Sequence, residues 1–234
     1  MSQPQFPPLF SSLDWTGKGD PFSEACAQAA QGCDAGLVAF DLAPDRLRAA
    51  VVFAPEVPLK DAIVMLPVCG VGFQNAFGAL APPEVGVHLE WAGSIRVNGG
   101  RCGKLTVAAS DVDPATIPDW LVVGLEVQLW PANDETGHTP DETALYAEGC
   151  SDVDAVELLE AWMRHTLVGI NSWADTGVAA AHREWIGIAH GVGKEILVCG
   201  KSGIFLGVDE RLGLLLQQGD KTTLVPLTDL LRDR

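Results

Sequence analysis

The stretch HREWIGIAHGVGKEI (residues 182–196), followed by GIFLGVDERLGLLLQQGDKTTLVPL (residues 203–227), decides the fold of this chain. Its first part continues a helical pattern that starts at Ser151 and is interrupted at Gly177. Its second part holds only short apolar runs, which predict strands joined by tight turns. We therefore expect a small all-β unit behind a hinge near Gly191–Lys194. The turn residues that break these runs are Gly200, Asp209-Glu210 and Gly219-Asp220.

Upstream of this unit, strand and helix patterns alternate. Asp20 and Pro21 open an alanine-rich segment that predicts a helix. Leu59–Leu80 has apolar residues at helical spacing, although Pro67 and Gly70 interrupt it. The fold class that follows is α+β, with a mixed central sheet packed with helices over residues 1–190 and an all-β barrel over residues 191–234. The predicted strands are 37–42, 46–54, 86–91, 94–97, 104–108 and 121–130.

A long amphipathic helix precedes the C-terminal unit. Ser151 is expected to cap it, with Asp154 in the capping-box position. The polar, acidic segment 131–150 before it is rich in turn formers and predicts a surface loop. Helical spacing places Val153, Val156, Leu159, Met163, Leu167, Ile170 and Trp173 on the buried side.

Composition excludes several classes of function. The formal net charge is −16, whereas nucleic-acid binding needs clustered Lys and Arg. Apolar runs fall short of the roughly 20 residues of a membrane span, and the N-terminus lacks the features of a signal peptide, so we expect a cytoplasmic protein. The six cysteines show no metal-ligand or disulfide spacing, so we expect no metal site.

The chemistry is indicated by the stretch EWAGSIRVNGGRCGKL (90–105) and by VGLEVQL (123–129). Together with the order of elements at the C-terminus, these stretches resemble the biotin protein ligases. That family carries K-W-P-N-D, then a K-L-A/G-G hairpin, then a G-I/A-G-I/V-N strand. The resemblance implies a ligase catalytic sheet with a C-terminal SH3-like barrel. It also implies acyl-adenylate formation from ATP and biotin, and transfer to a lysine of a carrier protein.

Several family positions differ here. Glu90 stands at the lysine of K-W-P-N-D, Arg101 at the pocket lysine, and Glu126 at the second glycine of the nucleotide strand. A carboxylate at that glycine position would repel phosphate. Ligases of this family also place a G-R-G-R-R-G loop between two early strands, where this chain has only Ala43-Pro44-Asp45. ATP and biotin are therefore disfavoured as ligands. Some family members carry an N-terminal helix-turn-helix, but strand patterns begin here by Leu37, so we expect none.

The resemblance assigns candidate residues, each with a plainer alternative. Arg101 would pair with the acid group of a ligand. Alternatively, it is a solvent-exposed residue at the end of a strand. Trp91 would line the pocket, or belongs to the core. Asn98 also fits a tight hairpin turn with Gly99. The complete set is Arg101 and Lys104 as catalytic residues, and Trp91, Arg96, Asn98, Gly124 and Gln128 as ligand-binding residues.

Three functions remain open. The first is acyl or biotinyl transfer with an altered active site, for which Cys102 and Lys104 are the nearby nucleophile candidates. The second is a non-catalytic module that binds a small carboxylic acid. The third is a protein-interaction subunit, and a homodimer is one partner arrangement that stays open. Because the chain is acidic, any carrier protein it modifies should present a neutral or basic face.

Overall fold

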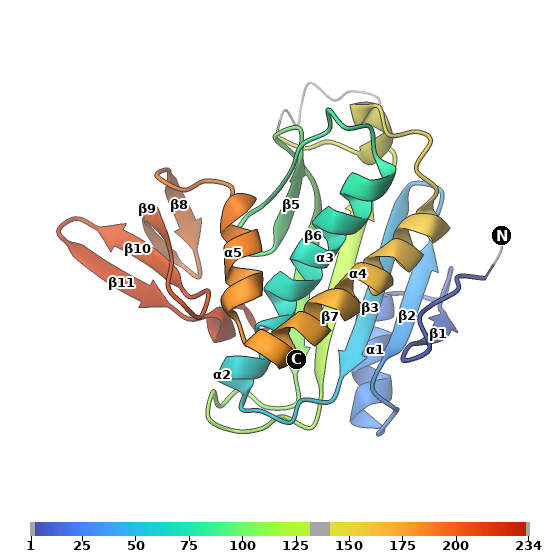
Figure 1. The fold of residues 1–234 in the computed structure, drawn as a ribbon, viewed down its shortest axis with the longest axis horizontal. Coiled ribbons are helices and arrows are strands. Elements are labelled where there is room, and N and C mark those ends of the chain that lie inside the picture. The colour runs from blue at the N-terminus through green and yellow to red at the C-terminus, as the bar shows by residue number, and fades with distance from the viewer. Residues whose placement is uncertain (1–2, 132–140, 233–234) are drawn as a thin grey trace.

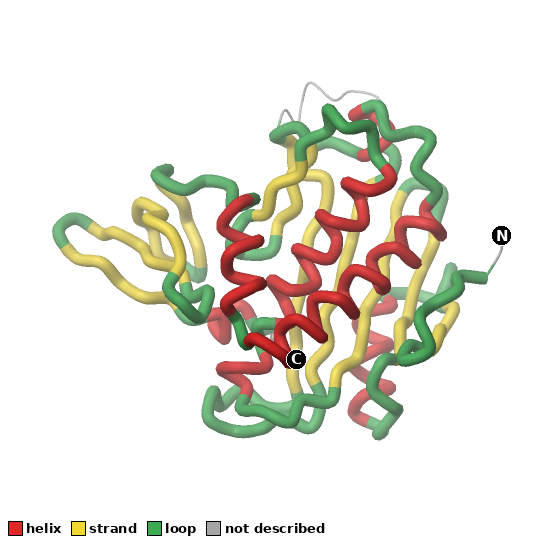
Figure 2. Tube along the Cα trace, in the orientation of Figure 1, coloured by secondary structure: helices red, strands yellow, loops and turns green. Residues whose placement is uncertain are grey.

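The computed structural model describes residues 3–131 and 141–232. Most of them form one seven-stranded sheet with helices on both faces (Figures 1 and 2), followed by a second, four-stranded sheet. The large sheet has the strand order β1-β2-β3-β7-β6-β5-β4. Its strands are β1 (Ser11–Asp14), β2 (Leu37–Leu42), β3 (Arg46–Phe53), β4 (Val87–Leu89), β5 (Ser94–Val97), β6 (Gly100–Ala109) and β7 (Leu121–Gln128).

The mixed sheet and its helices confirm the predicted fold class. All neighbouring strands run antiparallel except β1, which pairs parallel to β2. Strand β1 was not among the predicted strands, because its four residues SSLD lack the alternation of a half-buried strand.

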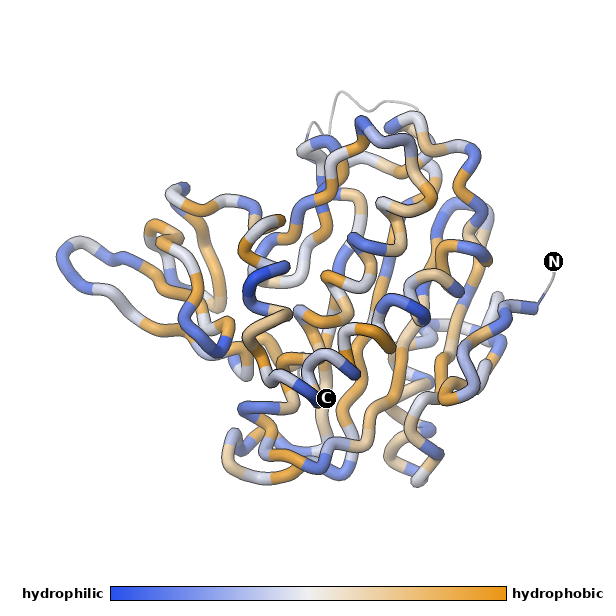
Figure 3. The backbone as a smooth tube through the Cα atoms, in the orientation of Figure 1, coloured by the Kyte–Doolittle hydropathy of each residue, from blue (hydrophilic) through white to orange (hydrophobic). Residues whose placement is uncertain are grey.

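Two helices, α3 (Met65–Leu80) and α4 (Ala155–Thr176), cross one face of this sheet, and α1 (Pro21–Ala30) covers part of the other (Figure 1). Between α3, α4 and the sheet lies the main core, in which Trp162, Phe73 and Phe77 are fully buried. Alanines and valines of the central strands meet α1 in a second, smaller core. Apolar residues therefore follow the central strands in Figure 3.

The predicted helix Leu59–Leu80 is divided into α2 (Leu59–Ala62) and α3. Pro67 lies in the first turn of α3, where a missing N–H is tolerated. Gly70 sits against β4 and β6, since a Cβ there would lie 2.8 Å from the Leu89 side chain. Among the described residues, Leu59–Leu80 meets the length and hydropathy of a membrane span, yet 72% of its most apolar window is buried inside the protein. It is the core helix of this fold.

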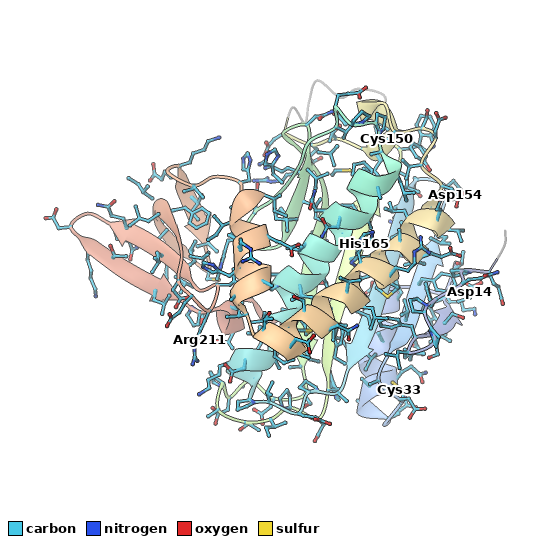
Figure 4. All side chains as sticks on the ribbon, in the orientation of Figure 1. Asp14, Cys33, Cys150, Asp154, His165 and Arg211 are labelled. Carbon is cyan, nitrogen blue, oxygen red and sulfur yellow. The ribbon has the colours of Figure 1, made fainter. Side chains whose placement is uncertain are left out.

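The start of α4 differs from the prediction. Asp154, and not Ser151, is the N-cap: its carboxylate accepts hydrogen bonds from the backbone N–H groups of Val156 and Glu157 (Figure 4 labels Asp154). Asp154 is extended and can aim its side chain at the first turn, whereas Ser151 lies in a preceding turn. The buried side of α4 includes Trp162, which the predicted set omitted, while Leu167, Ile170 and Trp173 are only half-buried.

Part of the predicted surface loop 131–150 lies outside the described residues. Residues 141–150, which the structure describes, form more regular structure than the predicted surface loop. It contains the short helix η2 (Leu145–Glu148), and Ala144, Leu145 and Cys150 are buried.

The C-terminal unit follows α5 (Ala179–Gly187). It is a four-stranded antiparallel sheet in the order β11-β10-β9-β8, and within the described residues the sheet does not close into the predicted barrel. A closed barrel leaves no strand edge unpaired, whereas β8 and β11 are the two edges of this sheet, and the chain turns into η3 (Leu227–Leu230) after β11. The strands are β8 (Glu195–Val198), β9 (Lys201–Val208), β10 (Leu214–Gln218) and β11 (Lys221–Val225).

Several contacts join the C-terminal sheet to the large one. Trp91 Nε1 donates a 2.8 Å hydrogen bond to the carbonyl of Leu212, and both residues are buried. Arg211 lies beside α2 (Figure 4), with Nη1 3.7 Å from the carboxylate of Asp61. The backbone of Leu231 also forms a parallel bridge with Val107 of β6. The chain thus returns to the large sheet after forming the small one.

Candidate functional site: the open face of the large sheet

The face of the large sheet opposite α3 and α4 carries the polar side chains of the central strands. Leu47, Val51, Leu105, Leu125 and Val127 point into the main core, so the residues that alternate with them point to the other face. On β3, β6 and β7 these are Arg46, Arg48, Lys104, Thr106, Gly124, Glu126 and Gln128. Helix α1 covers only the part of this face around Ala50 and Val122. We call the uncovered remainder the open face.

A row of alternating charges crosses the open face. Asp41 of β2 pairs with Arg48 of β3, Arg48 with Glu126 of β7, and Glu126 with Lys104 of β6. Arg48 Nη2 lies 2.5 Å from the Asp41 carboxylate, and Lys104 Nζ lies 3.2 Å from that of Glu126. We call these four residues the charge row. Two acids balance two bases within it, so it offers no net positive charge to a phosphate chain.

A cavity of about 320 Å³ adjoins the charge row, a volume within the usual range for small-molecule sites. Gly124 and Thr106 lie on its sheet side, and Phe22 at the start of α1 forms a wall. A side chain in place of Gly124 would fill this space, because its Cβ would lie 2.6 Å from the Phe22 ring. The cavity is lined by Asp20, Pro21, Phe22, Arg48, Ala49, Lys104, Thr106, Gly124, Leu125, Glu126 and Arg232.

A cluster of arginines and carboxylates occupies the end of the open face near β4 and β5. Arg96 is only 7% exposed, and its guanidinium binds the carboxylates of Glu90 and Asp141 and the carbonyl of Gly99. Arg101 is held more loosely, at 3.4 Å from Glu90 and 3.2 Å from Asp141, and half of its side chain is exposed. Of the two, Arg101 is the one that a ligand could reach.

The ionisation of this cluster follows from these contacts. Burial raises the pKa of Glu90, but the hydrogen bond and charge of Arg96 outweigh it, so the pKa is lowered overall. The hydrogen bond from Arg96 likewise lowers the pKa of Asp141. Burial and the charge of Arg96 lower the pKa of His190, which lies near the exposed His88. Both carboxylates are therefore anions near neutral pH and compensate the arginines.

The structure separates the predicted site residues into three groups. Lys104 and Gly124 line the cavity, and Arg96 and Arg101 belong to the arginine cluster. Trp91 is only 5% exposed and faces the C-terminal sheet. Its contacts agree with the alternative that it belongs to the core.

Asn98 and Gln128 make local hydrogen bonds. Asn98 has a positive φ of 49°, accepts a hydrogen bond from the N–H of Gly86 and donates one to Glu148. These contacts fit its role in a hairpin turn. Gln128 lies on the open face beside Arg46, and its amide nitrogen donates to the carbonyl of Trp130.

Cys102 is in the core and not on the open face. It is 2% exposed, and burial together with the charge of Glu148 raises its pKa to about 12. A thiol with this pKa stays protonated at neutral pH and is a poor nucleophile. Of the two nucleophile candidates, Lys104 is the accessible one, with 58% of its side chain exposed.

The β2–β3 connection is as short as the sequence indicates. Ala43 and Arg46 exchange backbone hydrogen bonds, and the carbonyl of Asp45 accepts from the N–H groups of Leu129 and Trp130. This turn is tied to the end of β7 and presents no glycine-rich backbone to the open face. Among the described residues there is also no group of three or more His, Cys, Asp or Glu that could hold a metal ion.

Sequence reasoning missed several residues of the open face. Arg46 and Arg48 alternate with apolar residues on β3, so their common face could have been read from the sequence. The position of Arg232 could not be predicted from the sequence, because it depends on the return of the C-terminal tail to β6. In the structure, the guanidinium of Arg232 lies 5.6 Å from the centre of the Phe22 ring.

The class of ligase-fold proteins is indicated by a large, mostly antiparallel sheet with α3 and α4 on one face, α1 on part of the other, and an all-β C-terminal unit. Residues 6–187 match the sequence model of the biotin/lipoate A/B protein ligase family, and residues 192–233 match a domain of unknown function, DUF4444. The chain belongs to the biotin/lipoate A/B protein ligase family. Comparison with curated protein sequences finds no significant match.

Solved structures agree with this assignment. A biotin protein ligase-like protein of unknown function from Silicibacter sp. TM1040 is 57% identical, with a TM-score of 0.93 over 99% of this chain and 100% of that one. The biotin protein ligase of Aquifex aeolicus in complex with biotin and ATP is 14% identical, with a TM-score of 0.69 over 93% and 94% of the two chains. That of Leishmania major in complex with biotin is 12% identical, with a TM-score of 0.58 over 94% and 98%. The last two show a shared fold.

Proposed function

We propose that this protein binds a small carboxylic acid, or the acyl group derived from one, on the open face of the large sheet, without activating the acid with ATP. The observation that carries the proposal is the position of the cavity over Gly124 and Thr106, on the same sheet face as the accessible arginine Arg101. A guanidinium matches a carboxylate with two parallel hydrogen bonds, and a cavity with an apolar wall can hold the tail of the acid.

Two features argue against acyl-adenylate formation. The charge row places the Glu126 carboxylate beside the cavity, where it would repel phosphate groups. The turn Ala43–Asp45 provides no backbone N–H groups to surround an adenylate. Acyl transfer without ATP would rely on Lys104 as the accessible amine, and Glu126 would have to release it first.

A thermal-shift screen tests binding. Short-chain, medium-chain and biotin-like acids should include at least one that stabilises the wild type. Arg101→Ala should weaken that stabilisation, whereas Arg164→Ala should not. The two arginines are matched, since each is 50% exposed and pairs with a glutamate that is 22% exposed. Arg164 lies on α4, across the sheet from the open face.

A pyrophosphate-release assay with ATP and each acid tests the second part of the proposal. No release above background is expected. Release of pyrophosphate, or an acyl-adenylate detected by mass spectrometry, would show that the protein activates acids after all. A complete absence of acid binding would refute the carboxylate-binding function.

A second candidate function is self-association through the C-terminal sheet, which we propose forms a separate domain over residues 191–234. One observation favours it: the outward face of this sheet exposes apolar side chains, with Leu197 77% and Leu224 50% exposed. Exposed apolar groups of this kind often mark interaction surfaces. Light scattering should show a dimer for the wild type and a monomer for Leu197→Lys. Monomeric wild-type protein would exclude this candidate.

A further inference from the structure

The two edge strands of the C-terminal sheet, β8 and β11, differ in character. β11 begins with Lys221 and is followed by Pro226, and lysine and proline are residues that commonly keep a strand edge from pairing. β8 has the sequence EILV and contains neither. Its Ile196 is half-buried, and Leu197 is 77% exposed. Among the described residues, β9 is the only strand that pairs with β8, so β8 is an unprotected edge.

The backbone of β8 directs hydrogen-bonding groups along this edge. The carbonyl of Lys194, directly before β8, accepts a 2.9 Å hydrogen bond from the N–H of Phe205 in β9. In an antiparallel pair, residues that bond the neighbouring strand alternate with residues whose N–H and C=O point away from it. Glu195 and Leu197 therefore point their N–H and C=O groups away from β9, where another strand could bond to them.

The distribution of charge favours a second copy of this chain as that partner. Residues 191–234 contain six basic and six acidic residues, so the whole net charge of −16 lies in residues 1–190. Charge of one sign repels two copies of the large sheet at long range, whereas two C-terminal sheets can approach each other. Figure 1 shows the C-terminal sheet projecting to one side of the large one.

The edges of the large sheet are less suited to such a contact. The edge at β4 is already covered, because Leu89 donates its N–H to the carbonyl of Ile188 and accepts from the N–H of His190. The other edge, β1, has the polar sequence SSLD and belongs to the acidic part of the chain. The edge at β8 is therefore the one that fits a second copy best.

We propose that two copies of this protein associate by pairing β8 of one copy antiparallel with β8 of the other, which joins their C-terminal sheets into one continuous sheet. This inference rests on the self-association proposed above and adds the contact through which it occurs. A pairing centred on Ile196 places Glu195 opposite Leu197 of the second copy, so the outward-directed groups of both strands bond to each other. It is two-fold symmetric, and the Glu195 carboxylates do not face each other directly.

Sedimentation of the full chain over a concentration series tests the contact. The wild type should form dimers. Leu197→Pro should weaken association roughly tenfold or more, because it removes an edge N–H that the second copy needs. The change spares the pairing of β8 with β9, since proline is tolerated where the N–H points away from the sheet. Leu224→Lys is the control: Leu224 is exposed on the same sheet but lies on β11, so dimers should remain.

Disulfide trapping tests the pairing without relying on the folding of Leu197→Pro. Ile196→Cys in a Cys199→Ser background should be oxidised by diamide to a covalent dimer. Residues opposite each other in a non-hydrogen-bonded pair have Cα atoms about 4.5 Å apart, which a disulfide can span. Leu206→Cys in the same background should stay monomeric, because Leu206 is exposed on β9 and lies away from the β8 edge.

The outcomes separate this inference from the proposal on which it rests. Wild-type protein that stays monomeric at every concentration would refute both, and would leave acid binding on the open face unaffected. If Leu224→Lys separates the copies and Leu197→Pro does not, the copies meet through the outward face of the sheet and the pairing of β8 is wrong. A dimeric Ile196→Cys variant that forms no disulfide would overturn the pairing centred on Ile196.

Discussion

Lys104 and Glu126 face each other across β6 and β7, with Nζ of Lys104 3.2 Å from the Glu126 carboxylate. The motif resemblance places Glu126 at a glycine position of the family, and in the structure its carboxylate compensates a cation beside the cavity. The pair is also part of a longer row, because Glu126 is paired in register with Arg48 on its other side. Glu126 thus lies between two cations of the charge row.

We predict that Glu126→Gln strengthens the binding of acids. The change removes a negative charge beside the ligand and frees Lys104, so the affinity for octanoate should rise by roughly 3- to 10-fold, or about 1 kcal/mol. The stability of the fold should change by less than about 1 kcal/mol, since the pair is partly exposed. Calorimetry measures the affinity and urea unfolding measures the stability.

Glu160→Gln is the control for this prediction. Glu160 also pairs with a base at the surface, Arg164, but lies on α4 on the other side of the sheet. It should leave acid binding unchanged. Equal or weaker binding in Glu126→Gln would mean that the ligand does not approach the charge row.

Trp91 is predicted to act on stability and not on ligand binding. Trp91→Phe keeps the apolar ring but removes the donor to the buried carbonyl of Leu212, which should cost about 1–3 kcal/mol of unfolding free energy. Octanoate affinity of the folded variant should match that of the wild type. Trp130→Phe is the comparison, because Trp130 is 52% exposed and its replacement should cost much less. If the well-folded Trp91→Phe variant no longer binds acids, Trp91 contributes to the ligand site.

The arginine cluster predicts a dependence of stability on pH. The pKa values of Glu90 and Asp141 lie below their ordinary values of 4.5 and 3.8 because Arg96 binds both carboxylates. A carboxyl group with a lowered folded-state pKa stabilises the protein above its unfolded pKa, and this contribution is lost as the pH falls through the folded pKa. Wild-type stability should therefore decline as the pH falls below about 4.5.

Arg96→Met tests the origin of that decline. It should lower stability at pH 7, because Glu90 loses the partner that offsets its burial, and it should make the acid decline shallower. Urea unfolding between pH 3 and pH 7 measures both effects. Arg164→Met, at an exposed pair, should keep the wild-type profile. If the stability of Arg96→Met falls at acid pH as steeply as that of the wild type, other carboxylates cause the decline.

Local sequence patterns predict part of this fold. The strands Leu37–Leu42 and Arg46–Phe53 were predicted nearly to the residue, because apolar β-branched runs and a turn mark their ends. The motif resemblance also identified the family. The position of Glu126 at the second glycine of the family strand stays a prediction from that resemblance.

The arrangement of the site depended on pairings that one sequence does not reveal. The charge row requires the register of β3 against β7, which are separated by α3 and four other elements of the chain. The partner of Arg101 and Arg96, Asp141, comes from a segment whose acidic residues gave no sign of pairing with β6. Burial of Cys102 follows from the irregular register of β5 and β6, which shifts between Ile95 and Arg96.

The last prediction concerns Cys102 as a nucleophile. Its pKa of about 12 leaves on the order of one thiol in 10,000 ionised at pH 8, and its side chain is enclosed by the core. Brief treatment of the folded protein with iodoacetamide should label the exposed Cys199 well before Cys102, and peptide mass mapping would show the order. Incubation with an octanoyl thioester should leave Cys102 without an acyl group, and Cys102→Ala should bind octanoate as the wild type does. Unfolding in urea should make both cysteines react alike, which confirms that the fold causes the difference. Labelling of Cys102 at the rate of Cys199 in folded protein, or an acyl adduct on it, would show that transfer through a thioester is open to this protein.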